Sequence, residues 1–210
     1  MAQQATQQTH PLHTPQDELI LVVKREHLLP AHQTWQGLKT DNMDSFVEII
    51  KTHQEFMPRS RAEVDERYKQ IIPYAVFRFQ DRYFLMQRKA SSTEQRLKSK
   101  YTLGIGGHVR KEDMDGASIF DWALREFHEE VHFSGNLTHT TLGLLNDDSN
   151  EVGRVHLGLV LLIDGDSSNI SVRSELAQGF LASMDEFKLY EHQMESWTAT
   201  IVSHLQSAAI

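Results

Sequence analysis

The sequence lacks cysteine altogether, which excludes disulfide bonds, thiolate metal sites and cysteine nucleophiles. It also lacks a long apolar run. The longest, residues 157–163, includes Gly158 and is far shorter than the roughly 20 residues of a membrane-spanning helix. The apolar centre of a signal peptide is missing from the polar N-terminal residues, so we expect a cytoplasmic location.

An excess of positive charge is missing as well, because the formal net charge is −8 at pH 7. Such a surface does not attract nucleic acid or anionic lipid through bulk electrostatics. If the substrate is a polyphosphate, a metal ion or a local basic loop must offset the repulsion between like charges.

What is present divides the chain into three segments. Residues 1–16 are polar and rich in Gln and Thr, and we predict a disordered tail. Residues 17–69 are predicted to form a small α/β extension, with a buried strand at 18–24 and helical spacing of apolar residues at 44–53. Residues 70–210 have a different texture and are predicted to form the main domain.

The main domain alternates between strand and helix patterns. A short polar helix is predicted at 60–69, directly before the main domain. The predicted strands of the main domain cover residues 71–80, 82–89, 101–109, 136–145 and 155–163. The strongest helix signal covers residues 117–133, with Gly135 as its stop, and a closing amphipathic helix is predicted over 190–206. Strands on both sides of one dominant helix favour a mixed β-sheet sandwiched by helices, an α/β/α arrangement.

Within the dominant helix, residues 128–132 read HEEVH, the pattern with which two histidines one turn apart hold zinc in metalloproteases. The longer form of that signature needs a third histidine at position 138, where the sequence has Thr138, with His139 one residue late. A zinc metalloprotease is therefore a remote alternative.

The same helix carries a second pattern on a different face. Glu126, Glu129 and Glu130 stand at positions i, i+3 and i+4, which brings three carboxylates onto one patch. At about 100° per residue, Glu126 and Glu130 centre roughly 160° from His128 and His132, so the two sets cannot line one cavity. Hard oxygen ligands at this density suit Mg²⁺ or Mn²⁺.

The two glycines Gly106 and Gly107, followed by the helical string REFHEE at 125–130, resemble the box of the Nudix hydrolase superfamily. That box reads Gly-x5-Glu-x7-Arg-Glu-apolar-x-Glu-Glu-x-Gly-apolar, and the resemblance covers roughly residues 70–205. The flanking segments QIIPYAVFR and LKSKYTLGIGGH resemble a predicted-phosphoesterase subgroup that also carries an N-terminal extension. The resemblance implies a Nudix-like α/β/α sandwich that hydrolyses a pyrophosphate linkage in a nucleoside diphosphate joined to another moiety.

The resemblance also implies roles for individual residues. The metal ligands would be Glu126, Glu129, Glu130 and the carbonyl of Gly106. Arg125 would be structural, holding a neighbouring carboxylate such as Glu129. The catalytic set would be Glu126, Glu130 and Glu175, with Glu175 either a further metal ligand, a general base or an exposed loop residue.

Three departures from the box leave a second hypothesis open, a Nudix-fold nucleotide-binding or regulatory module with weak turnover. The loop before the helix is longer than the pattern, Ala117 replaces the first Glu of the box, and His132 stands where the box has Gly. Glu112 or Asp113 in the enlarged loop could compensate for that Glu.

The basic loop before Gly106 supplies candidates for binding substrate phosphate, Arg88 and Arg96. The expected partner is a small phosphorylated, nucleotide-derived molecule; neither a membrane nor a nucleic acid is expected, and a homodimer is left open.

Overall fold

The computed structural model describes residues 17–31, 34–90, 98–114, 118–173 and 176–208. The predicted disordered tail, residues 1–16, lies outside the described residues. The strands are β1 (Leu19–Lys24), β2 (Gly37–Lys39), β3 (Gln54–Pro58), β4 (Tyr68–Phe79), β5 (Arg82–Arg88), β6 (Tyr101–Thr102), β7 (Gly104–Gly106), β8 (Val131–His132), β9 (Leu137–Asn146), β10 (His156–Gly165), β11 (Ser171–Val172) and β12 (Leu176–Ala182). The α-helices are α1 (Arg25–Leu28), α2 (Met43–His53), α3 (Arg59–Ala62), α4 (Ile119–Glu130), α5 (Glu151–Val155) and α6 (Ser196–Ala208).

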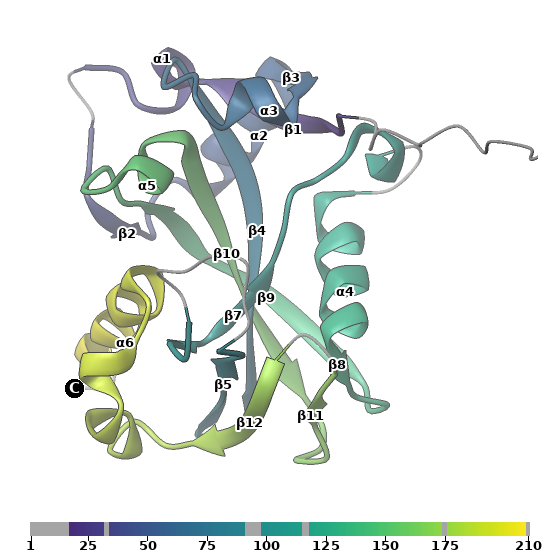
Figure 1. The fold of residues 1–210 in the computed structure, drawn as a ribbon, viewed down its shortest axis with the longest axis vertical. Coiled ribbons are helices and arrows are strands. Elements are labelled where there is room, and N and C mark those ends of the chain that lie inside the picture. The colour runs from purple at the N-terminus through teal and green to yellow at the C-terminus, as the bar shows by residue number, and fades with distance from the viewer. Residues whose placement is uncertain (1–16, 32–33, 91–97, 115–117, 174–175, 209–210) are drawn as a thin grey trace, which may run out of the picture.

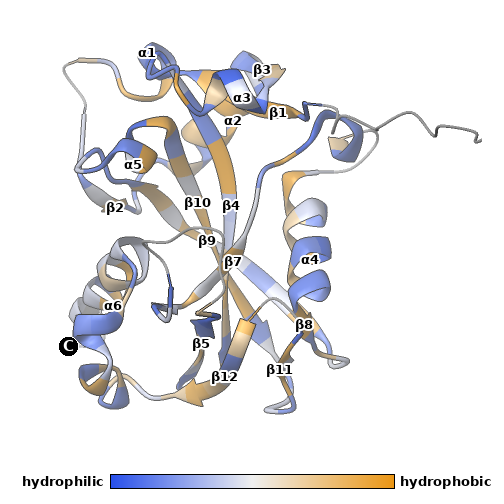
Figure 2. Ribbon diagram, in the orientation of Figure 1, coloured by the Kyte–Doolittle hydropathy of each residue, from blue (hydrophilic) through white to orange (hydrophobic). Residues whose placement is uncertain are grey.

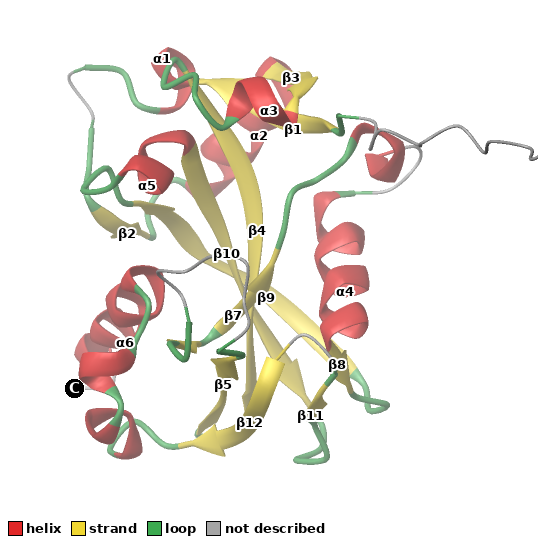
Figure 3. Ribbon diagram, viewed as in Figure 1, coloured by secondary structure: helices red, strands yellow, loops and turns green. Residues whose placement is uncertain are grey.

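A ten-stranded mixed sheet runs through the centre of the molecule, with α4 and α6 on opposite sides of it (Figure 1). Its main path has the order β12–β5–β4–β10–β9–β2. Strands β4 and β10 are parallel, whereas β9, β5 and β12 join by antiparallel pairing. The predicted α/β/α sandwich with a mixed sheet is confirmed (Figure 3).

The hairpin predicted from two alternating apolar runs is confirmed as β4 and β5. Arg78 pairs with Tyr83 and Phe79 with Arg82, so the turn consists of two residues, and the first, Gln80, has a φ of 56°. Two-residue hairpin turns favour positive φ, because the twist of such turns matches that of the strands.

Two large apolar cores lie on the two faces of the sheet, and the central strands β4 and β10 carry hydrophobic stretches (Figure 2). On the α4 face, the ring of Phe127 stacks on that of Phe77 at 5.7 Å between centroids, and Phe133 packs edge-on against Phe77. On the α6 face, Ile201 and Val202 are buried against strand residues. Each dominant helix is therefore fixed by burial of one apolar face.

Helix α4 begins as the sequence predicts and ends earlier. Ser118 and Asp121 form a capping box, in which each side chain accepts a hydrogen bond from the other residue's backbone N–H. The predicted end at residue 133 is wrong, because the helix stops at Glu130. Val131 is fully buried and pairs with Val172 in the β8–β11 ladder. This strand pairing of a β-branched residue prevails over the helical spacing of the apolar residues.

The closing helix is also shorter at its start than predicted, beginning at Ser196 rather than at residue 190. Two short 3₁₀ turns occupy Glu186–Leu189 and Glu191–Gln193. Met194 is buried, and the N–H of Glu195 donates to the carbonyl of Tyr101 at 3.0 Å, so this segment is bound to β6 instead of entering the helix.

The N-terminal segment shares the sheet and the core of the main domain. Strand β1 pairs with β4 through Val22 and Gln70, and the N–H of Leu21 donates to the carbonyl of Val109 at 2.8 Å. The helix predicted at 60–69 is wrong beyond its first turn, because α3 ends at Ala62 and β4 already begins at Tyr68. None of the helices in the described ranges is long and apolar enough to cross a membrane.

Candidate functional site

The paired glycines at the end of β7 lie against the helix that carries the glutamates. A Cβ atom on Gly106 would lie 2.2 Å from the carbonyl oxygen of Pro73, so only glycine lets β7 approach β4 this closely. A Cβ atom on Gly107 would lie 3.4 Å from Oε2 of Glu126 and 3.6 Å from the ring of Trp122. The glycine turn and the Glu126 carboxylate are therefore direct neighbours in space, as the box resemblance expects.

The glutamates of α4 carry charge that the protein only partly offsets. The side chain of Glu126 is 20% exposed and that of Glu129 is 59% exposed. Arg125 lies between them, with a guanidinium nitrogen 3.3 Å from Oε1 of Glu126 and Nε 3.6 Å from Oε1 of Glu129. Burial, together with the charge of Glu129, raises the pKa of Glu126 above its ordinary value, although Arg125 opposes this.

Glu130 is the last residue of α4, and its charge acts on that of Arg88. Burial opposes the charge of Arg88, but Glu195, with smaller contributions from Tyr74 and Glu130, raises the pKa of Arg88 above its ordinary value. In the described part of the chain, the ligand atoms of the three α4 glutamates do not all lie within 4.8 Å of one another. A set of hard oxygen donors on one helix face nevertheless fits a divalent cation that would draw them together.

Asp113, in the 3₁₀ turn before α4, forms hydrogen bonds with residues around the α4 glutamates. The sequence suggested it only as a substitute for the first Glu of the box. Its side chain is 5% exposed and accepts hydrogen bonds from Arg110 Nε at 2.9 Å, Trp122 Nε1 at 2.9 Å and a terminal nitrogen of Arg125 at 2.7 Å. Burial favours the neutral acid, but hydrogen bonds from Arg125, Arg110 and Trp122 hold the pKa of Asp113 well below its usual range. Asp113 therefore positions Arg125, which in turn contacts the glutamates.

Replacing Asp113 with Asn is expected to lower the free energy of unfolding by about 1–3 kcal/mol at pH 7, because charge-assisted hydrogen bonds are lost in a buried place. An acid whose pKa falls on folding stabilises the protein above its unfolded pKa, and this stability is lost as the pH falls through the folded pKa. The difference between wild type and variant should therefore shrink as the pH falls below about 4. Urea unfolding at pH 7 and pH 3 measures it. A difference that is equal at both values would contradict the prediction.

A pocket of about 210 Å³ opens beside the glycine turn and gathers residues from distant parts of the chain. Its lining includes Tyr74, Arg88, Gly106, Gly107, Glu195 and Trp197. Nε of Arg88 lies 2.5 Å from Oε1 of Glu195, whose side chain is 9% exposed. The predicted phosphate contact Arg88 thus reaches the pocket, but with much of its charge already paired. Sequence reasoning missed Glu195, because nothing in its neighbourhood marks it.

Several predicted residues cannot be placed at the site. Arg96, Ala117 and Glu175 lie outside the described residues. The zinc protease alternative is wrong, because α4 ends at Glu130 and His132 belongs to β8, so His128 and His132 do not share a helix. Both of these histidines are exposed.

Most of the chain is similar to a curated relative and to a solved structure. No protein-family model matches the sequence. Protein YmaB of Bacillus subtilis (strain 168) is 32% identical over 206 residues, covering 90% of this chain and 98% of YmaB. The crystal structure of Tm1382, assigned as a candidate Nudix hydrolase, superposes with a TM-score of 0.77 at 33% identity and covers 91% of this chain and 100% of Tm1382.

A more distant solved structure shares the fold alone. The NUDIX domain of Shewanella oneidensis NrtR, crystallised with ADP ribose, has a TM-score of 0.53 at 12% identity. It covers 68% of this chain and 89% of that domain, whereas Tm1382 covers nearly all of this chain.

Proposed function

The chain belongs to the Nudix hydrolase superfamily, and we propose that it cleaves a pyrophosphate linkage in a nucleoside diphosphate joined to another moiety. The observation that carries the proposal is the nearness of the Glu126 carboxylate to the glycine turn: a Cβ atom on Gly107 would lie 3.4 Å from Oε2 of Glu126, and Gly107 lines a pocket together with Arg88. It supports a site in which the α4 carboxylates adjoin a backbone turn that, with a cationic side chain, lines the pocket.

Mg²⁺ or Mn²⁺ would be held by Glu126, Glu129, Glu130 and the carbonyl of Gly106. When bound, the ion offsets the negative charge of the substrate and stabilises the charge that develops as the P–O bond breaks. The partly buried Glu126 retains its ligating position through Arg125 and, behind it, Asp113. Glu175 is the proposed general base, provided that it lies within hydrogen-bond reach of the attacking water.

The pocket supplies separate surfaces for the two ends of the substrate. Arg88 would contact a phosphate, which competes with Glu195 for the guanidinium group. Trp197, whose ring meets that of Tyr74 edge-on at 5.5 Å, is partly exposed in the pocket and offers a face for a nucleobase. Arg96 remains a proposed second phosphate contact.

The test is a screen of ADP-ribose, nucleotide sugars, dinucleoside polyphosphates and nucleoside triphosphates with Mg²⁺ or Mn²⁺. We expect cleavage of at least one compound to two phosphate-bearing products, abolished by EDTA and restored by added metal. Release of no product from any compound would overturn the proposal. Saturable nucleotide binding in that case would instead identify the weakly active binding module.

A further inference from the structure

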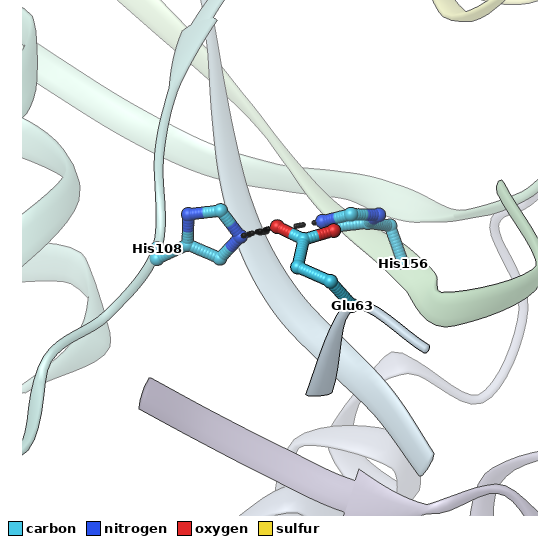
Figure 4. A group of neighbouring side chains, drawn as sticks. All are labelled: Glu63, His108 and His156. Atoms are coloured by element: carbon cyan, nitrogen blue, oxygen red, sulfur yellow. Dashed lines mark hydrogen bonds and ion pairs between the residues drawn. The ribbon is translucent and has the colours of Figure 1, made fainter. Parts of the chain in front are cut away.

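We infer that Glu63, His108 and His156 form a binding site for a divalent transition metal of the zinc type, separate from the glutamates of α4. The three residues come from different parts of the chain: Glu63 directly follows α3, His108 follows β7, and His156 begins β10 (Figure 4). Among the described residues, theirs are the only ligand atoms of three His, Asp or Glu side chains that lie within 4.8 Å of one another.

The distances suit a tetrahedral ion. Nε2 of His108 lies 3.3 Å from Nε2 of His156 and 3.6 Å from Oε1 of Glu63. Zinc bonds of 2.0–2.1 Å at tetrahedral angles place neighbouring ligand atoms about 3.3 Å apart. The two imidazoles therefore already stand at the separation that an ion between them requires, and the carboxylate needs to move by only a few tenths of an ångström.

The protonation state of His156 also suits a ligand. Its Nδ1 atom lies 2.8 Å from the carbonyl oxygen of Val152, which can only accept a hydrogen bond. Nδ1 therefore carries the proton, and Nε2, which points toward His108 and Glu63, has the lone pair. A backbone carbonyl behind the other ring nitrogen is the usual support of a metal-ligating histidine.

The surroundings supply the remaining supports of such a site. Nε of Arg59 lies 3.4 Å from Oε1 of Glu63, the same carboxylate oxygen that Nε2 of His108 approaches at 3.6 Å. Gln70, fully buried, is the register partner of His156 in the parallel β4–β10 pair, so both side chains leave the same face of the sheet. Neither polar atom of the Gln70 amide has a hydrogen-bond partner among the described residues. An unsatisfied buried polar group therefore lies on the same sheet face as His156.

The site would join the N-terminal segment to the pocket. His108 and His156 line the 210 Å³ pocket, whereas Glu63 belongs to the N-terminal segment, so the ion would bind the two parts together. Nitrogen ligands favour Zn²⁺ over Mg²⁺, so Zn²⁺ would bind this site and Mg²⁺ the glutamates of α4.

The test is titration of the full chain, freed of metal with a chelator, with Zn²⁺ against a chromophoric competitor. We expect one tight equivalent that millimolar Mg²⁺ does not displace. His108→Ala and His156→Ala should weaken the affinity by more than about 100-fold, the upper end of the effect of removing a mere supporting residue. His128→Ala and His132→Ala are matched controls on exposed histidines and should leave it unchanged.

Glu63→Gln protects the test against misfolding of the histidine variants, because the Glu63 side chain is 36% exposed. This variant should fold as the wild type does by circular dichroism and bind Zn²⁺ at least about 10-fold more weakly. X-ray absorption of the zinc-loaded wild type should show two imidazole ligands. Absence of tight binding, equal affinity in Glu63→Gln, or loss of binding in the His128 and His132 variants would each overturn the inference.

Discussion

The Glu126→Gln variant is expected to hydrolyse the substrate at least about 100-fold more slowly than the wild type, the scale on which loss of one group that stabilises the transition state acts. The side chain of Glu126 is only 20% exposed, and its Oε2 lies 3.4 Å from the place that a Cβ atom on Gly107 would take. An amide of nearly the same shape retains the packing but loses the charge that would hold a divalent ion. The measurement is kcat over a range of Mg²⁺ concentrations, where the variant should need more metal for half-maximal rate.

Urea unfolding distinguishes a loss of activity in Glu126→Gln from misfolding of the variant. Because the pKa of Glu126 is raised, its charged form is disfavoured in the folded state, so removing the charge should not destabilise the metal-free protein at pH 7. The urea midpoint of Glu126→Gln in EDTA is therefore expected to equal or exceed that of the wild type. Glu48→Gln, an exposed change on α2, is the matched control and should keep full activity. Normal turnover by Glu126→Gln would exclude Glu126 from the metal site.

Asp148→Ala is expected to cost about 3–5 kcal/mol of the free energy of unfolding, because it leaves a buried ammonium group without its counter-ion. Lys69 is fully buried, and its Nζ lies 2.8 Å from Oδ1 of Asp148. Nζ also donates to the carbonyls of Gly153 and His156 at 2.6 Å and 3.2 Å. The second partner of Asp148 is Arg25, at the start of α1.

The pH dependence follows from the same contacts. Burial favours the neutral acid, but hydrogen bonds from Arg25, Lys69 and Asn146 lower the pKa of Asp148 to about 2. A depressed pKa stabilises the folded protein above the unfolded pKa, so the contribution should be complete at neutral pH and lost as the pH falls from about 4 toward 2.

Urea unfolding followed by circular dichroism measures the loss in Asp148→Ala. Asp185→Ala, which breaks an exposed ion pair with Lys188, is the matched control and should change stability by less than about 1 kcal/mol. The double variant Lys69→Met, Asp148→Ala should recover part of the loss, since no unpaired ammonium group remains. If the single variant stayed within 1 kcal/mol of the wild type, the ion pair would carry no net stability.

Local patterns predicted the parts of the fold that depend on neighbouring residues. The β4–β5 hairpin follows from alternation of apolar residues on either side of a two-residue turn. The amphipathic spacing likewise places α4, and the glutamates at i, i+3 and i+4 must share a face wherever the helix packs. The family was identifiable from the same string.

Pairing between strands far apart in the sequence explains two helix predictions that were wrong, the end of α4 at residue 133 and the helix at 60–69. Val131 continues the helical apolar pattern, yet its pairing with Val172, distant in sequence, makes it a strand residue. The pattern at 60–69 looks helical, but pairing of Tyr68 and Gln70 with β1 and His156 extends β4 into that segment. Periodicity reports only which residues share a face, and a strand partner far along the chain decides between helix and strand.

The sequence by itself determined the glutamate face of α4, the glycine turn and the absence of thiol chemistry, because each depends on residue type and on spacing within one element. Only the tertiary structure decided that Asp113 anchors Arg125, that Glu195 pairs with Arg88, and that Glu63, His108 and His156 meet. The reason is physical: these side chains belong to separate elements, and contacts between residues far apart in the sequence bring them within bonding distance. The parallel β4–β10 pair carries His156, and the bond from Glu195 N–H to the Tyr101 carbonyl holds Glu195 beside β6.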